Sequence, residues 1–215
     1  IIGGTGSGKT SLINLIPRFY DVRQGEVLVD GVDVKEYPFS QLRGMIGIVP
    51  QKAVLFKGTI RHNMQWRDKN ATDEDIWNAL DIAQAKDFVE KKPDKLDEMI
   101  LQEGKNLSGG QRQRLTIARA LVGDPEILIL DDSASALDLA TDARLRKAIH
   151  EKTSGMTVFI VSQRISSIKS ADKIIVLDDG KIAGIGTHSE LYKGCEVYKE
   201  ICLSQLSEKE AQANG

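Results

Sequence analysis

The sequence predicts an α/β fold that combines a mostly parallel sheet with an antiparallel β subdomain and a helical lobe. The sheet is indicated by short aliphatic runs, each bounded by polar or turn residues, at 46–49, 127–130, 158–161 and 174–177. Continuous apolar runs of this length are typical of strands covered on both faces, as in a largely parallel α/β sheet. We therefore expect these runs to form the strands at the centre of the fold.

The antiparallel subdomain and the helical lobe are each predicted by a local pattern. Residues 25–34 (GEVLVDGVDV) alternate apolar and polar side chains on both sides of Asp30-Gly31. This dipeptide suits a tight turn with positive φ angles, so a β-hairpin is expected. From Thr72 the chain has helical character as far as Val122, and Thr72 with Asp75 resembles a capping box. We expect an inserted helical lobe over about residues 70–122.

The composition argues against several classes of protein. The chain has 215 residues, is 41% hydrophobic and carries a net charge of −2. Basic and acidic residues are interspersed, so no nucleic-acid partner is expected. The apolar runs are far shorter than the roughly 20 residues that span a bilayer, so membrane contact would require a partner or a further segment. Cys195 and Cys202 lack a nearby His or a second cysteine pair, which indicates reduced thiols instead of a disulfide framework or a zinc site.

A phosphate-binding loop is indicated at residues 3–10 (GGTGSGKT), which fit G-x-x-x-x-G-K-[ST] between a strand-like Ile1-Ile2 and an apolar-periodic segment. Glycines let successive N–H groups converge on phosphate oxygens, and the helix that follows presents its positive end. Lys9 should reach the β- and γ-phosphates, and Thr10 offers a hydroxyl to Mg²⁺. The alternative is a glycine-rich turn that merely connects strand to helix. The full match favours a P-loop NTPase core, although many ATPases, GTPases and small-molecule kinases share the motif.

A carboxylate follows the aliphatic run at 127–130. Asp131 stands where a Walker B strand would deliver an acidic side chain to the Mg²⁺ side of a nucleotide site. Taken alone, this could be a strand that ends in a solvated turn aspartate. Together with the phosphate loop, the functional interpretation is favoured.

Residues 107–111 (LSGGQ), followed by RQRL, resemble the signature motif of ATP-binding cassette (ABC) proteins and lie, as in that family, between the phosphate loop and the Walker B strand. The resemblance implies that Ser108, Gly109, Gly110 and Gln111 contact ATP held by an opposite cassette, so that two cassettes sandwich two nucleotides. Ser108 can also cap the helix that follows and aim N–H groups at an anion. A simple helix cap is the alternative.

Further motifs extend the resemblance over essentially the whole chain. Gln51 resembles the Q-loop glutamine, which helps to bind Mg²⁺ and senses the membrane domain. Ser135 to Asp138 resemble the D-loop, which touches the other subunit near its active site. Residues 55–60 (LFKGTI) with Asn63, and 102–104 (QEG), are similar to exporter-type cassettes, so an exporter is favoured over an importer.

Two positions depart from the family pattern. Active ABC sites place Glu directly after the Walker B aspartate, and here the residue is Asp132. One methylene fewer draws the carboxylate back by about 1.5 Å, and misplacement by about 1 Å can cost on the order of 100-fold in rate. Gln163 replaces the switch histidine; it can donate a hydrogen bond but cannot become cationic. We interpret Asp132 and Gln163 as altered catalytic residues of a site weak in hydrolysis, with harmless drift as the alternative.

The resemblance implies ATP and Mg²⁺ as cofactors. The nucleotide is expected to contact Gly4, Thr5, Gly6, Ser7, Gly8, Lys9, Thr10, Ser11, Gln51, Asp131 and Gln163. The metal is expected to bind Thr10, Gln51 and Asp131.

The domain organisation is also an expectation. A strand normally needs more than two residues, so Ile1-Ile2 is interpreted as part of an element that the sequence cuts. We expect residues 1–204 to be an ABC nucleotide-binding domain truncated on its N-terminal side, with a transmembrane domain fused upstream. Residues 205–215 are expected to form a flexible tail. The aromatic residue that stacks on adenine in the family would lie upstream of Ile1. The resemblance implies a location on the cytoplasmic face of the cell membrane.

Three functions remain open from the sequence. The first is the ATPase subunit of a heterodimeric ABC exporter, because a complete signature can serve a competent site on a second half-transporter while this chain's own site hydrolyses weakly. The second is a regulatory module that binds ATP without turning it over. The third, a soluble ABC protein acting on ribosomes or DNA, lacks support because the sequence has no second cassette, long coiled coil or basic run. The transported substrate cannot be read from these residues.

Overall fold

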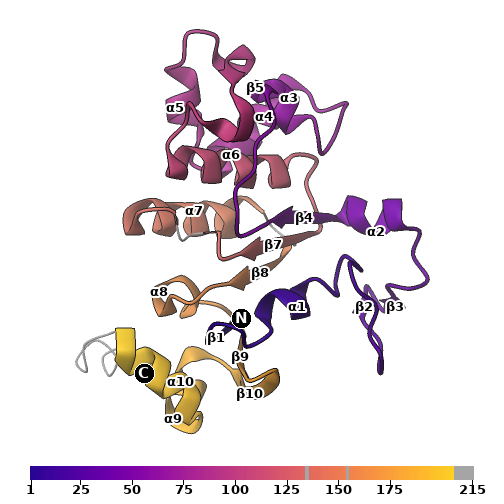
Figure 1. Cartoon of the computed structure of the whole chain (residues 1–215), viewed down its shortest axis with the longest axis vertical. Helices are drawn as coiled ribbons and strands as arrows, with labels where there is room; N and C mark the ends of the chain where they lie inside the picture. The colour runs from indigo at the N-terminus through magenta and orange to yellow at the C-terminus, as the bar shows by residue number, and fades with distance from the viewer. Residues whose placement is uncertain (134–135, 154, 206–215) are drawn as a thin grey trace. The chain divides into compact units, whose positions relative to one another are not determined.

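The computed structural model describes residues 1–133, 136–153 and 155–205, which belong to two compact units (Figure 1). Of these described residues, 1–42 and 159–205 belong to unit 1, and those between 43 and 158 belong to unit 2. The chain passes from unit 1 to unit 2 within helix α2 (Phe39–Met45) and returns within strand β8 (Thr157–Val161). In the described ranges, no helix is both long and apolar enough to cross a membrane.

Unit 1 is built around a three-stranded sheet in the order β1-β9-β10. Strand β1 (Ile2–Gly3) pairs with β9 (Ile174–Asp178) in parallel, and β9 pairs with β10 (Lys181–Gly186) in antiparallel. The apolar side chains of β1 and β9 are buried together with residues of three C-terminal helices. The helices of unit 1 that lie wholly within it are α1 (Lys9–Ile13), α8 (Ile165–Ile168), α9 (His188–Gly194) and α10 (Glu196–Gln205).

The predicted hairpin is present in unit 1. Strands β2 (Leu28–Val29) and β3 (Val32–Asp33) pair in antiparallel. Asp30 and Gly31 between them have φ angles of 49° and 79°, the left-handed conformation that a two-residue turn of this kind needs. The hairpin is therefore confirmed, together with its turn.

Strand β10 is not anticipated from the sequence. Residues 181–186 (KIAGIG) contain two glycines and lie mostly exposed, so no buried face produces an apolar pattern. The ladder with β9 is irregular between Ile182 and Gly184, where the register shifts. A short, glycine-containing edge strand of this kind carries little sequence signal.

Unit 2 contains the parallel pair β4 (Ile46–Val49) and β7 (Ile127–Asp131). Their register sets Ile46 opposite Ile127 and Val49 opposite Leu130. Both strands are largely buried, as their aliphatic runs predict. The helices of unit 2 are α3 (Ile60–Met64), α4 (Asp73–Ile82), α5 (Lys86–Glu90), α6 (Gly109–Leu121) and α7 (Leu139–Lys152).

The stretch predicted as helical from Thr72 to Val122 is interrupted. Helix α4 begins with the predicted capping box at Thr72, and α5 and α6 follow. Between α5 and α6 the chain instead forms the 3₁₀ turns η1 (Lys95–Asp97) and η2 (Gln102–Gly104) and strand β6 (Met99–Ile100), which pairs with β5 (Gly58–Thr59). Lys95 and Glu103 have φ angles of 48° and 59°, which a right-handed helix cannot accommodate.

The structure describes only the first residue of the expected C-terminal tail. Gln205, the first residue of the predicted flexible tail at 205–215, is the last residue of α10. The rest of that tail, residues 206–215, lies outside the described residues.

The close contact between β4 and α6 gives a test of the packing in unit 2. A Cβ atom on Gly47 of β4 would lie 2.3 Å from the carbonyl oxygen of Ala120 and 3.1 Å from Pro125. Gly47→Ala should therefore lower the free energy of unfolding by about 1–3 kcal/mol, measured by urea denaturation. Gly44→Ala is the matched control, because a Cβ there meets nothing within 4 Å and alanine favours the helix. Equal unfolding midpoints for the two variants would contradict the packing.

Candidate nucleotide-binding site

The phosphate loop of unit 1 is organised around Lys9. Its ammonium group donates hydrogen bonds to the carbonyl oxygens of Gly3 (2.9 Å) and Gly4 (2.7 Å) and to the hydroxyl oxygen of Ser7 (3.3 Å). Lys9 and Ser7 are buried, at 9% and 4% exposure. A buried ammonium needs this set of acceptors, and the same set holds the loop in a curl around the lysine.

The outer side of the loop is open. Gly4, Thr5 and Gly6 are exposed, and a Cβ on Gly4 or Gly6 would meet nothing within 4 Å. Gly6 and Gly8 have φ angles of 82° and 91°, which other residues rarely adopt. An exposed glycine loop that surrounds a buried cation suits a phosphate chain, whose oxygens need N–H donors and positive charge. A triphosphate therefore fits the residues that are present.

Strand β1 leads into this loop and also contacts the segment that carries Gln163. The nitrogen of Ile1 donates to the carbonyl oxygen of Ile160 (2.7 Å), and the N–H of Ser162 donates to the carbonyl oxygen of Ile1 (3.2 Å). Gln163 follows directly and is exposed. Gln163, which is predicted to contact the γ-phosphate, therefore lies one residue beyond a backbone contact with the segment that enters the phosphate loop. Thr10 and Ser11, at the start of α1, are also exposed.

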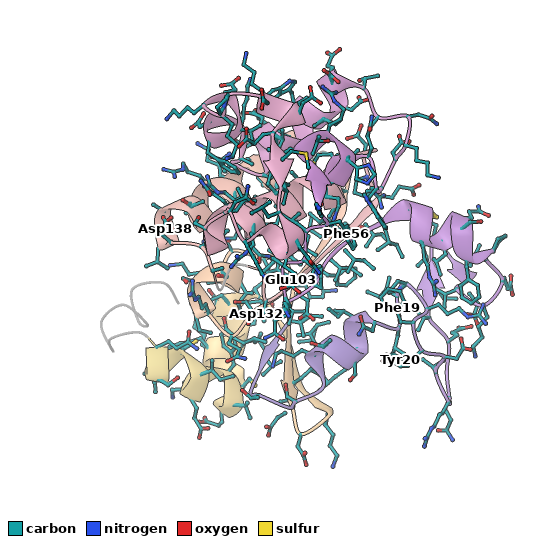
Figure 2. The ribbon with its side chains drawn as sticks, turned by 45° about the horizontal axis from the view of Figure 1, so that its top comes forward. Phe19, Tyr20, Phe56, Glu103, Asp132 and Asp138 are labelled. Atoms are coloured by element: carbon teal, nitrogen blue, oxygen red, sulfur yellow. The ribbon has the colours of Figure 1, made fainter. Side chains whose placement is uncertain are left out.

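Unit 2 carries the acidic residues. Asp131 is the last residue of β7 and is buried, at 8% exposure, and Asp132 follows with a φ angle of 46°. Asp tolerates this left-handed conformation better than most residues because its short side chain can hydrogen-bond locally. Asp132 is labelled in Figure 2.

Gln51 contacts Asp132 directly, whereas the family resemblance implies only that Gln51 and Asp131 share a metal ion. The side-chain nitrogen Nε2 of Gln51 is 3.5 Å from Oδ2 of Asp132, a long hydrogen bond. The cause is the parallel register: Val49 stands opposite Leu130, so the residues two positions further along each strand are neighbours. The sequence shows only that Gln51 and Asp132 each follow an aliphatic run by two residues. The pairing of β4 with β7 is what brings the two side chains together.

The signature residues lie at the start of α6 in unit 2. Ser108 accepts a hydrogen bond from the N–H of Gln111 (3.2 Å), and the Gln111 side chain accepts one from the N–H of Ser108 (3.0 Å), which completes a capping box. Ser108 and Gly109 are exposed. A Cβ on Gly110 would lie 3.4 Å from the carbonyl oxygen of Ala136, so the helix start lies against the predicted D-loop.

The end of the predicted D-loop caps the next helix. Asp138, labelled in Figure 2, accepts hydrogen bonds from the N–H and hydroxyl of Thr141 at the start of α7 (2.9 and 2.7 Å). These bonds hold the pKa of Asp138 below its usual range, so the carboxylate is ionised at neutral pH. Ser135, the first residue of the D-loop prediction, lies outside the described residues.

The exporter-like segment of unit 2 forms an apolar, partly exposed surface. Asn63 accepts a hydrogen bond from the N–H of Phe56 and donates to its carbonyl oxygen, both at 2.9 Å. Phe56 stacks on Trp66 with ring centroids 4.2 Å apart, and both rings are exposed, at 40% and 55%. No sequence pattern singles out Trp66 for this contact. A hollow of about 520 Å³ adjoins it, lined by His62, Gln65, Trp66 and Lys69.

The predicted site residues are thus divided between the units. The phosphate-loop residues 4–11 and Gln163 lie in unit 1, whereas Gln51, Asp131, Asp132 and residues 108–111 lie in unit 2. Within the described ranges, no group of three or more His, Cys, Asp or Glu side chains could hold a metal ion. In proteins, Mg²⁺ is usually bound by one or two carboxylates together with substrate phosphate oxygens and water.

Comparisons with known proteins identify the family. Residues 1–135 match the family described as ABC transporter. An uncharacterized ABC transporter ATP-binding protein of Mycobacterium bovis is 46% identical over 208 residues, which cover 95% of this chain and 35% of the relative. The ATP-dependent lipid A-core flippase of Hahella chejuensis is 42% identical over 212 residues, which cover 98% of this chain and 36% of the flippase.

A solved structure agrees with these relatives. The structure of a bacterial Atm1-family ABC exporter with ATP bound matches 96% of this chain and 36% of its own, with a TM-score of 0.91 and 36% sequence identity. This chain belongs to the ABC transporter family. It spans about a third of the length of the curated relatives.

The comparisons confirm the predicted fold class, a P-loop NTPase core of α/β type, and the predicted family. They support nucleotide binding as a property of the domain. The assignment of individual residues to ATP, Mg²⁺ and catalysis stays a prediction.

Proposed function

We propose that this chain is the ATP-binding and ATP-hydrolysing subunit of an ABC exporter and that it powers transport across a membrane. The proposal is carried by the open glycine loop around buried Lys9, in a chain that resembles an ATP-bound Atm1-family exporter over 96% of its length. In this proposal residues 4–11 hold the phosphates of ATP. Thr10, Gln51 and Asp131 bind Mg²⁺, which neutralises the charge that develops on the phosphates.

A transmembrane domain is the first partner in this proposal. It is fused upstream of Ile1, and the chain works on the cytoplasmic face of the cell membrane. The exposed Phe56–Trp66 pair and the adjoining hollow supply an apolar surface on unit 2 on which a helix of that domain can dock. The named relatives support this partner because a lipid A-core flippase and an Atm1-family exporter are among them.

The second partner is another ABC half-transporter. In the family, the signature of one cassette closes on ATP held by the other, and here Ser108 and Gly109 are exposed at the start of α6. The helix start offers N–H groups and a partial positive charge to a phosphate. A complete signature beside altered catalytic residues favours a heterodimer, in which this chain serves the partner's site better than its own.

The weak point of its own site lies at Asp132 and Gln163. Asp132 would orient the attacking water, but its carboxylate is one methylene shorter than that of Glu, and its amide partner Gln51 is 3.5 Å away. Gln163 would touch the γ-phosphate as a neutral donor. The same two residues favour the alternative proposal, a regulatory module that binds ATP and does not turn it over.

Restoring the usual residues tests the weak-site proposal. Asp132→Glu combined with Gln163→His should raise hydrolysis at this chain's site at least about tenfold, because 1 Å of misplacement is worth on the order of 100-fold. The measurement is single-turnover release of labelled γ-phosphate by the assembled transporter, with hydrolysis at the partner's own site disabled by mutation. Adding Lys9→Ala should return the rate to background. A double variant no faster than the wild type would refute the weak site, and a wild type that binds ATP but releases no phosphate would favour the regulatory module.

Two equivalent helix caps test the role of the signature. Ser108→Ala and Thr72→Ala each remove a capping box in unit 2, so each should lower the free energy of unfolding by about 1 kcal/mol in urea denaturation. Only Ser108→Ala should also slow ATP hydrolysis by the assembled transporter, because only Ser108 contacts the partner's nucleotide. Equal loss of ATPase activity in both variants would show that Ser108 is no more than a cap.

A further inference from the structure

Gln205 makes two hydrogen bonds to the loop that carries Gln163. Its side-chain nitrogen Nε2 donates to the carbonyl oxygen of Gln163 (2.6 Å), and its Oε1 accepts from the N–H of Ile165 (3.0 Å). One amide group thus bridges the residues on either side of Arg164. A side-chain amide suits this position because it supplies one donor and one acceptor at once.

The helix that carries Gln205 is firmly anchored in unit 1. Tyr198 and Cys202 of α10 are fully buried in the core cluster with residues of β9, α8 and α9. The hydroxyl of Tyr198 is 2.8 Å from Nδ1 of His188 on α9. Burial raises the pKa of Tyr198 and lowers the pKa of His188, so both groups are neutral at pH 7 and their contact is a neutral hydrogen bond. Helix α10 is therefore held in the core as far as Cys202, three residues before the exposed Gln205.

The loop itself is held from both sides. On one side, the N–H of Ser162 donates to Ile1, and the hydroxyl oxygen of Ser162 accepts from the N–H of Arg164 (3.0 Å). On the other side, Gln205 is the contact from α10. Gln163 is exposed between these attachments, so its backbone is fixed while its side chain is accessible.

We propose that Gln205 is a positioning residue for the nucleotide site, holding the backbone of Gln163 so that its side chain faces the γ-phosphate of bound ATP. This inference rests on the proposed role of Gln163. Gln205 touches no nucleotide and acts through the Gln163 carbonyl and the Ile165 N–H. Through these two hydrogen bonds, α10 influences how well the site distinguishes a triphosphate from a diphosphate.

The test compares affinities for two nucleotides, because Gln163 contacts only the γ-phosphate in this account. In the assembled transporter with Mg²⁺, Gln205→Ala should weaken binding of the β,γ-imido analogue of ATP about three- to tenfold, the size of one or two hydrogen bonds. Affinity for ADP should change less than about twofold. A general loss of structure would weaken the binding of both nucleotides equally. The diagnostic quantity is therefore the ratio of the affinity for the ATP analogue to the affinity for ADP.

Two further variants sharpen the result. Gln205→Glu keeps an acceptor for the Ile165 N–H but has no donor for the Gln163 carbonyl, so it should lower the ratio as Gln205→Ala does. Ser204→Ala is the matched control on the same helix, because its hydroxyl donates to Ile201 within α10 and should leave the ratio unchanged. A Gln205→Glu variant with the wild-type ratio would overturn the proposal.

Gln163→Ala separates this inference from the function on which it rests. It should lower the ratio at least as much as Gln205→Ala. If Gln163→Ala lowers the ratio and Gln205→Ala does not, Gln205 has no positioning role while the proposed site stands. If neither variant changes the ratio, Gln163 does not face the γ-phosphate, and the proposed roles of Gln163 and Gln205 both fail. Hydrolysis is not needed for this readout, so a site that binds ATP without turnover tests the role of Gln205 equally well.

Discussion

The proposed nucleotide site of unit 1 depends on the placement of the short strand β1. Gly3 lies so close to β9 that a Cβ would be 2.1 Å from the carbonyl oxygen of Leu177, so only glycine permits this approach. From that strand the chain turns at once into the loop, where the Lys9 ammonium binds the carbonyl oxygens of Gly3 and Gly4. The carbonyl of Ile1 also receives the N–H of Ser162. One strand therefore fixes both the phosphate loop and the start of the segment that carries Gln163.

Unit 2 obtains its functional geometry from strand register and helix caps. The parallel register of β4 and β7 brings Gln51 to Asp132, and the tight contact of Gly47 with the carbonyl of Ala120 holds α6 against β4. The capping box at Ser108 defines where α6 begins, beside the residues that precede α7. In both units, residues with proposed roles follow within two positions of a strand end, where the sheet can position them.

The features predicted from sequence are those with a local physical cause. The strands at 46–49 and 127–130, the Asp30-Gly31 hairpin and the caps at Thr72 and Ser108 each arise from neighbouring residues. The missed features join residues far apart in the chain: Gln51 with Asp132, β5 with β6, and Gln205 with Gln163. A polar residue gives no sequence signal for a hydrogen-bond partner 42 positions away. The site motifs could be recognised, whereas the contacts that orient them needed the fold.

The central claim is that a second cassette completes the binding site around the ATP that this chain's phosphate loop holds. Sedimentation velocity of this domain mixed with the cassette of its partner half-transporter tests it most directly. The account predicts that ATP with Mg²⁺ produces a heterodimer, that chelation of Mg²⁺ disperses it, and that Lys9→Ala weakens it. A complex that never forms with any candidate partner cassette, or that forms equally well without nucleotide, would contradict the account.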